Sequence, residues 1–166
     1  MARAEQLLED MLDAGLRPAA QTFTVLLSGH ARAGNVDGAA ALWARLEEFG
    51  VEPGVPHYNC MIQAHARASR LDKAEEWMAR LSGTKSGPNT HSFGALMDAH
   101  ANAGNFARCR ELVEQMKAAG LPGNRVIQNT LIKAYTAAGE LDSAEAVVGE
   151  MAGCGDPELA PDAYSY

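Results

Sequence analysis

The sequence predicts an all-α fold, a solenoid of helix-turn-helix repeats of about 35 residues, and the first indication is an internal echo. Segments 29–39 and 64–74 read GHARAGNVDGA and AHARASRLDKA, 35 positions apart. AHANAGNFARC at 99–109 and AYTAAGELDSA at 134–144 continue the series with the same step. A fixed step of about 20–50 residues is typical of repeat proteins, in which each unit buries its apolar face against its neighbours.

The second indication is that single positions keep this step in columns of similar size and polarity. The columns are Pro18, Pro53 and Pro88; Phe23, Tyr58 and Phe93; Leu26, Met61, Leu96 and Leu131; Leu27, Ile62, Met97 and Ile132; Gly34, Ser69, Gly104 and Gly139; and Ala39, Ala74, Cys109 and Ala144. Because whole columns recur, the echo belongs to a structural unit and not to one short motif.

The third indication is the apolar spacing inside the first complete unit, which predicts two helices, near 22–33 and 36–49. Gly34 is expected to end the first helix, because glycine accepts the left-handed conformation of a C-cap. Asp37 is expected in the first turn of the second helix, where a carboxylate complements the helix dipole. The positions with the i, i+3, i+4, i+7 spacing of a helix face are Phe23, Leu26, Leu27, His30 and Ala31, then Ala39, Leu42, Trp43 and Leu46.

The step divides the chain into four complete units and two incomplete ones. The complete units are 20–54, 55–89, 90–124 and 125–162, and the last has three extra residues in its GCGDPELAPD loop. Residues 1–19 would supply only a second helix, and 163–166 only the start of a further repeat. Since solenoid ends need polar caps, we expect the sequence to be a piece of a longer chain.

Composition narrows the classes of function. The formal net charge is −7, and 47% of the residues are hydrophobic. No apolar run reaches the 18 residues of a membrane span, so we expect no membrane insertion. The three cysteines lie in different repeats without a C-x-x-C pattern, which favours reduced structural thiols over a disulfide or a metal site.

Short motifs identify the repeat family. The step differs from the 34 residues of the tetratricopeptide repeat, and Trp43 and Trp77 are one position out of register with each other. First helices open with YNCMI and QNTLI, and second helices close with MLDAGLRP and MKAAGLPG. These segments resemble the pentatricopeptide repeat, whose units open with Tyr-Asn-x-Leu-Ile and close with Met…Gly…Pro-Asp. The resemblance covers essentially the whole chain.

This resemblance implies a right-handed α-α superhelix that binds single-stranded RNA, mostly in mitochondria or chloroplasts, with about one base per repeat. In the family, the fifth residue of the first helix and the last residue of the repeat select the base, and the second residue packs on it. The base-selecting pairs would be Thr24 with Gly54, Asn59 with Asn89, Gly94 with Asn124, and Asn129 with Asp162. The base-packing residues would be Gln21, Pro56, His91 and Val126.

Two of these pairs fit the family's pattern and two depart from it. By the resemblance, Asn–Asn in the second repeat implies a pyrimidine with some preference for cytosine, and Asn–Asp in the fourth implies uracil. Gly94 has no side chain to donate a hydrogen bond, and Gly54 cannot support Thr24. We therefore expect degenerate readout, or none, in the first and third repeats.

The charge is distributed unevenly, which bears on an RNA partner more than its total does. First-helix segments (20–33, 55–68, 90–103 and 125–138) contain four basic residues against one acidic residue, a net +3, which leaves −10 for the rest. Arg32, Arg67 and Lys133 are the expected phosphate contacts. A groove with so little positive charge predicts weak RNA binding by this segment alone.

The column of His30, His65 and His100 is predicted to be packing. The column supplies one histidine per repeat, and packed helices are about 8–10 Å apart. Zinc requires its ligands at about 2.0–2.1 Å, so these histidines are not expected to meet at one ion. Tyr135 takes the same place in the fourth repeat. An RNA contact and a metal site are the alternatives, and no cofactor is expected.

Two functions remain open at this point. The first is a sequence-selective RNA-binding adaptor acting on organellar transcripts. The second is a protein-binding scaffold, or a structural subunit of a large organellar complex. No G-x-S-x-G, H-E-x-x-H, P-loop or dinucleotide-binding motif occurs, so we do not expect an enzyme.

Overall fold

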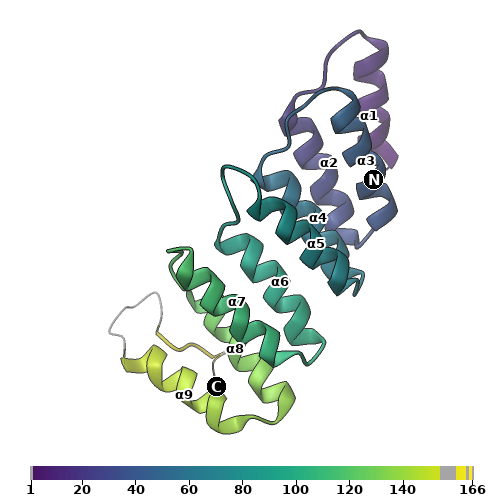
Figure 1. The fold of residues 1–166 in the computed structure, drawn as a ribbon. Helices are drawn as coiled ribbons and strands as arrows, with labels where there is room; N and C mark the ends of the chain where they lie inside the picture. Colours follow the sequence, from purple (N-terminus) through teal and green to yellow (C-terminus); the bar gives the residue numbers. More distant parts are fainter. Residues whose placement is uncertain (1, 154–159, 164, 166) are drawn as a thin grey trace. The chain divides into compact units, whose positions relative to one another are not determined.

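The computed structural model describes residues 2–153, 160–163 and 165. Within these residues the chain forms nine α-helices and no strand (Figure 1). The helices are α1 (Ala2–Asp13), α2 (Ala20–Ala33), α3 (Val36–Glu48), α4 (Val55–Arg67), α5 (Leu71–Ser82), α6 (Thr90–Asn102), α7 (Phe106–Ala118), α8 (Arg125–Ala138) and α9 (Leu141–Gly153). The all-α repeat fold predicted from the sequence is confirmed.

The first helices of the repeats begin at the predicted interval. Helices α2, α4, α6 and α8 start at Ala20, Val55, Thr90 and Arg125, which are 35 residues apart. The helices expected near 22–33 and 36–49 correspond to α2 and α3. Most of the loop with three extra residues, and part of the expected further repeat, lie outside the described residues.

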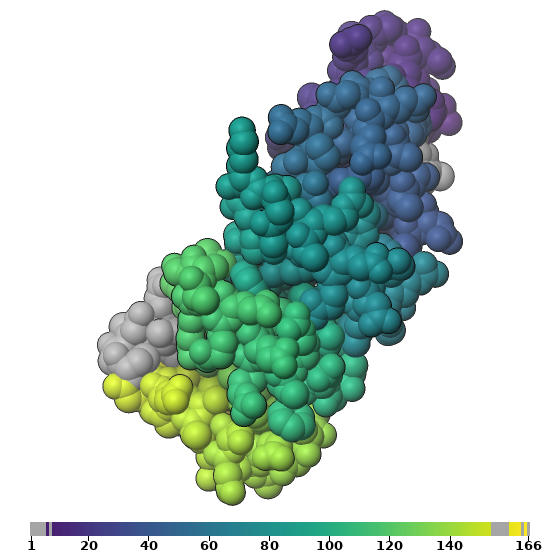
Figure 2. All heavy atoms as spheres, viewed as in Figure 1, coloured from purple at the N-terminus to yellow at the C-terminus, as the bar shows by residue number. Residues whose placement is uncertain are grey.

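The chain divides into two compact units, residues 1–88 and 89–166. In the first unit α2 packs against α1, α3 and α4, and α4 packs against α5; in the second, α8 packs against α6, α7 and α9. Within each unit, segments that follow one another in the sequence are neighbours in space (Figure 2). Apolar side chains, several of them from the columns, form both cores: Phe23, Leu27, Leu46, Met61 and Ile62 in the first unit, and Leu96, Met97, Leu112, Met116 and Ile127 in the second.

One column of the repeat adopts a left-handed backbone. Gly34, Gly104 and Gly139 have φ of 62°, 72° and 79°. Ser69 fills the same column with φ of 56°, and it is the one non-glycine residue with positive φ in the described part of the chain. A left-handed conformation costs an L-residue about 1–2 kcal/mol, so the turn after α4 is strained where its counterparts are relaxed.

The histidine column is buried packing, as predicted. His30, His65 and His100 are 2%, 7% and 5% exposed. A Cβ atom added at Gly38 would lie 2.3 Å from the His30 ring, so the imidazole rests directly on the α3 backbone. His65 stacks on Trp77 with ring centroids 6.5 Å apart. Among the described residues, no three histidine, cysteine or carboxylate side chains are grouped so as to hold a metal ion.

An aromatic cluster joins α3, α4 and α5 in the first unit. The Trp43 and Trp77 rings meet edge to face with centroids 4.5 Å apart, and Tyr58 lies 5.0 Å from Trp43. The Arg80 guanidinium lies 4.1 Å from the centroid of Trp77 and 5.5 Å from that of Trp43. Such cation–π contacts stabilise a partly exposed site by about 0.5–1 kcal/mol each.

The cysteines that the structure describes are thiols in the packed interior. Cys60 and Cys109 are buried and free, and burial raises the pKa of each thiol to about 11. The Cys109 Sγ donates to the Met97 carbonyl at 3.4 Å. Cys154 lies outside the described residues. In the described part of the chain, no helix has the length and apolar character of a membrane span.

Candidate nucleic-acid interface

The four residues expected to pack on bases are all exposed. Gln21, Pro56, His91 and Val126 each lie in the first turn of a first helix, on α2, α4, α6 and α8 respectively. The most apolar of them, Val126, is 68% exposed. An exposed apolar side chain at this place offers a flat base a contact surface without any rearrangement of the core.

The three predicted phosphate contacts are also on the surface, in different electrostatic settings. Arg32 and Arg67 are exposed in the last turns of α2 and α4. Lys133 in the middle of α8 forms an ion pair with Asp98 of α6 at 3.0 Å, and the two side chains are 50% and 57% exposed. An exposed pair of this kind is weak, so a phosphate could compete for the ammonium group.

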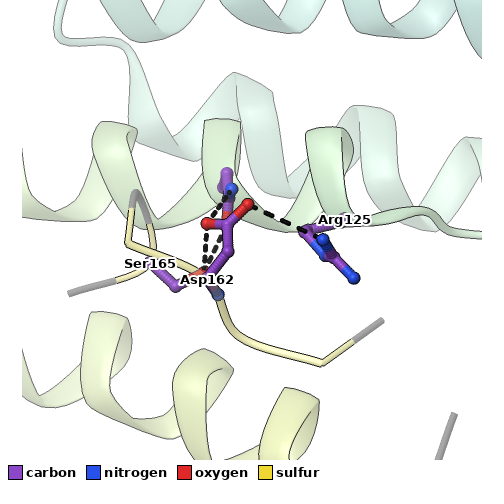
Figure 3. A network of polar contacts seen from close by, with 4 residues as sticks. Arg125, Asp162 and Ser165 are labelled. Atoms are coloured by element: carbon purple, nitrogen blue, oxygen red, sulfur yellow. Dashed lines mark hydrogen bonds and ion pairs between the residues drawn. The ribbon is translucent and has the colours of Figure 1, made fainter. Parts of the chain in front are cut away.

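In the fourth repeat, the structure brings the predicted base-selecting pair into contact. The Asn129 Nδ2 donates to Asp162 Oδ1 at 3.1 Å. The Ser165 hydroxyl donates to Asn129 Oδ1 at 2.7 Å and accepts from the Asp162 backbone N–H at 3.1 Å (Figure 3). Arg125 Nη1 lies 3.9 Å from Asp162 Oδ2. The Asn129 amide is therefore held at both ends by the segment that follows α9.

These groups line a shallow hollow of about 500 Å³ in the second unit. Its walls are Arg125, Val126, Asn129, Thr130, Lys133 and Asp162. Four of the six were predicted from the sequence: the base-packing, base-selecting and phosphate-contact residues of the fourth repeat. The hollow combines an exposed apolar side chain, an oriented amide and two cations, which together suit a base and its phosphate.

In the first repeat, the predicted pair does not meet directly, because Gly54 has no side chain. His57 connects the two positions. Its Nδ1 accepts from the Gly54 backbone N–H at 3.0 Å, and its Nε2 lies 3.1 Å from Thr24 Oγ1 and 3.0 Å from the Ala20 carbonyl. Since a backbone N–H can only donate, Nδ1 carries no proton, and the hydrogen of a neutral ring is on Nε2.

In the third repeat, the selecting residue Gly94 has no side chain, and its partner Asn124 is a helix cap. Asn124 uses its Oδ1 to accept from the Ile127 N–H at 2.9 Å and caps α8. A Cβ atom at Gly94 would meet the Cδ1 of Ile127 at 3.5 Å. The position thus has room for a small side chain, with an apolar atom as the nearest neighbour of its Cβ. That this repeat reads bases degenerately stays a prediction.

The second pair, Asn59 and Asn89, falls in two different units. Asn59 is 8% exposed. Asn89 is the N-cap of α6, where its Oδ1 accepts from the Ser92 N–H at 3.0 Å. The last residue of a repeat is therefore also the helix cap of the next one, as Asn124 shows as well.

Sequence reasoning missed Arg125 as a wall of the site and both residues that hold the selecting side chains, His57 and Ser165. His57 and Ser165 are each the third residue of a repeat, and the sequence does contain a pattern that indicates their role. In a capping box, the residue three positions after the N-cap reaches back to it, so a polar third residue after Gly54 or Asp162 is expected to lie beside the selecting pair.

Comparison with known families agrees with this geometry. A model of the pentatricopeptide repeat domain matches residues 6–68 and 85–137, and a model of the PPR repeat matches 56–82 and 129–156. A comparison with curated proteins gave no match.

Solved structures share the fold. PPR10 from maize superposes with a TM-score of 0.82 at 21% identity, covering 98% of this chain and 23% of that protein. PPR10 in complex with an 18-nt psaJ RNA element superposes with a TM-score of 0.86 at 22% identity, again covering 98% of this chain and 23% of that protein. The PPR domain of Arabidopsis thaliana protein-only RNase P 1, in complex with tRNA, superposes with a TM-score of 0.79 at 11% identity. This match covers 99% of this chain and 85% of that domain.

This chain thus spans about a quarter of the length of PPR10. The family model covers well over half of the chain, and the helical hairpins recur at the interval that its motifs predict. The chain belongs to the pentatricopeptide repeat family.

Proposed function

We propose that this chain is a non-catalytic, sequence-selective adaptor that binds single-stranded RNA of an organellar transcript, about one base per repeat. The observation that carries the proposal is the hollow of the fourth repeat, where Asn129 and Asp162 are hydrogen-bonded beside Val126 and Lys133. An oriented amide can read a base edge, and an adjacent exposed aliphatic side chain can cover the base face.

The comparisons add independent support. PPR10 was solved with an RNA element, and the PPR domain of protein-only RNase P 1 with tRNA. Their identity to this chain is low, so they support the class of ligand and leave the sequence it prefers to be measured.

Weak binding is part of the proposal. The three predicted phosphate contacts, Arg32, Arg67 and Lys133, are set against a net charge of −7 for the chain. Binding should therefore be detectable at low salt and fall with added salt, with a slope of log K against log salt of about −2, since each phosphate contact on a single strand contributes about −0.7.

Fluorescence anisotropy with labelled 10-nt RNAs tests this function. Uracil-rich and pyrimidine-mixed strands should bind at 50 mM salt more tightly than a purine strand, and a duplex of the same sequence should bind least, since its base edges are paired. A matched control is the Gln115→Ala variant, which changes an exposed amide on α7 away from the hollow and should bind as the parent does. Equal binding to every strand and to the duplex would contradict selective readout.

The second candidate is a protein-binding scaffold. The net charge of −7 favours it, together with the lack of a side-chain pair in two of the four repeats. If no RNA binds at 50 mM salt, while the chain folds with the expected helicity, the scaffold becomes the better proposal.

A further inference from the structure

We propose that the third residue of each following repeat is a specificity-determining positioning residue, which fixes the hydrogen-bonding group that the preceding base-selecting residue presents. This inference rests on the RNA-binding function proposed above. The residues concerned are His57 for Thr24 and Ser165 for Asn129; Ile127 takes the same place beside Gly94, which has no side-chain group to fix.

The fourth repeat shows the effect on an amide. An asparagine side chain has two N–H donors and two acceptor lone pairs on its oxygen. Asn129 gives one N–H to Asp162 and one lone pair to the Ser165 hydroxyl. The carboxylate can only accept, so the amide cannot turn over without placing its oxygen against Asp162. The remaining N–H is a donor of fixed direction, which suits a carbonyl oxygen on a base edge, as in uracil.

The first repeat shows the opposite outcome on a hydroxyl. Thr24 Oγ1 donates its single hydrogen to the Ala20 carbonyl at 3.1 Å. Nε2 of His57, which carries the ring hydrogen, lies 3.1 Å from the same Oγ1. The only hydrogen of the Thr24 hydroxyl is therefore already in a hydrogen bond, and the oxygen retains a lone pair that can accept one. It is an acceptor, which suits an exocyclic amino group, as in adenine or cytosine.

The third repeat shows the case without a polar partner. Ile127 brings a methyl group to the place where a side chain at residue 94 would begin, 3.5 Å from the ideal Cβ position. A polar side chain introduced there would meet an apolar third residue, whose side chain can neither donate nor accept a hydrogen bond.

The spacing shows that these three contacts are one recurring feature. His57 follows Thr24 by 33 residues, and Ile127 follows Gly94 by 33. Ser165 follows Asn129 by 36, which equals 33 plus the three extra residues of the last repeat. In each case the contact comes from the third residue of the next repeat. The next repeat thus contributes to the readout of the one before it.

The test uses the Ser165 position, because Ser165→Ala removes a single oxygen atom from this buried side chain and should leave the fold intact. The whole chain is incubated with a random 10-nt RNA pool at 50 mM salt, and the bound RNA is sequenced. The Asn129→Ala variant identifies the nucleotide that the fourth repeat reads, since preference is lost there. The Ser165→Ala variant removes the hydroxyl, and Ser165→Thr retains it.

At that nucleotide, Ser165→Ala should reduce the preference for uracil by about twofold to tenfold, the worth of one hydrogen bond. The other nucleotides should keep their preferences, and Ser165→Thr should restore the parent pattern. If Asn129→Ala flattens the preference and Ser165→Ala does not, the positioning role is wrong while the RNA-binding function stands. If the parent chain enriches no sequence, both are wrong.

A second measurement needs no RNA. The side-chain N–H signals of Asn129 are assigned in an amide NMR spectrum by their loss in Asn129→Ala. In the parent they should exchange with water more slowly than those of an exposed amide such as Gln115. Ser165→Ala should speed this exchange, and Ser165→Thr should return it to the parent rate. Exchange unchanged in Ser165→Ala would overturn the positioning role directly.

Discussion

The two compact units solve one problem, holding a base-selecting side chain, with different chemistry. In the first unit Thr24 is held by a buried imidazole, and His57 also binds the backbone of Gly54 and Ala20. In the second unit Asn129 is held by Ser165 and Asp162, both from the segment after α9. Both holding residues are buried, His57 at 3% and Ser165 at 4% exposure, but His57 lies within α4 whereas Ser165 lies in a turn after α9. The same column of the repeat therefore holds the selecting residue from a helix in one unit and from a turn in the other.

The largest expected effect separates these two roles through stability. His57→Ala should lower the free energy of unfolding by about 2–4 kcal/mol, because it leaves a cavity at a 3% exposed site and removes an acceptor from the Gly54 N–H. Ser165→Ala should cost only about 0.5–1.5 kcal/mol. Urea denaturation of the two variants measures the difference. Equal losses would mean that Ser165 is as structural as His57.

The next effect separates the units through binding. Asn129→Ala should weaken binding to uracil-containing RNA by about 1–3 kcal/mol, because it removes the oriented donor of the fourth repeat. Thr24→Ala should weaken binding by less, about 0.5–1 kcal/mol, since only a lone pair is lost. Anisotropy titrations at one salt concentration compare them, with Gln115→Ala as the control. A larger loss for Thr24→Ala would reverse the assignment of the stronger site.

A third effect concerns the left-handed column, which is strained at Ser69 in the first unit and relaxed at its glycines in both units. Ser69→Gly should stabilise the chain by about 0.5–1 kcal/mol, because relief of the φ of 56° exceeds the entropy that glycine adds to the unfolded chain. Gly104→Ala should destabilise it by about 1 kcal/mol. Nothing lies within 4 Å of a Cβ at Gly104, so the cost is that of backbone strain alone.

Thermal unfolding of the two variants measures this difference. The idea that Ser69 stores strain would be wrong if Ser69→Gly melted at or below the temperature of the parent chain.

The sequence could predict those features of the structure that recur with the repeat. The step of 35 residues placed the first helices at Ala20, Val55, Thr90 and Arg125, because helix formation depends on local spacing and caps. The pairing of Asn129 with Asp162 came from the resemblance to the pentatricopeptide repeat family, applied to this frame. The step did not reveal the roles of His57 and Ser165, because a contact between the third residue of one unit and the fifth of the previous one depends on how helices stack. The capping-box spacing places the third residue beside the last residue of the preceding repeat, but its contact with the fifth residue is set by packing.

The smallest effect concerns the histidine column, which ends in the second unit with Tyr135. Burial lowers the pKa of His65 below its ordinary value of 6.5, and the charges of Arg70 and Lys73 lower it further. The folded state therefore prefers the neutral ring. Its stabilising contribution is fully present above about pH 6.5 and is lost as the pH falls through the pKa of the folded state, because the unfolded state then binds more protons.

The free energy of unfolding should accordingly decrease from pH 7 to pH 5. The His65→Tyr variant gives the second repeat the tyrosine that the fourth repeat has at this position, and it should make that decrease smaller. The phenol does not titrate in this range, and a ring of similar shape already fills the column at Tyr135, which is 8% exposed. Urea titrations at several pH values, with the exposed His91→Tyr as the matched control, measure the change. An identical pH dependence in His65→Tyr and the parent would show that His65 does not contribute to acid sensitivity.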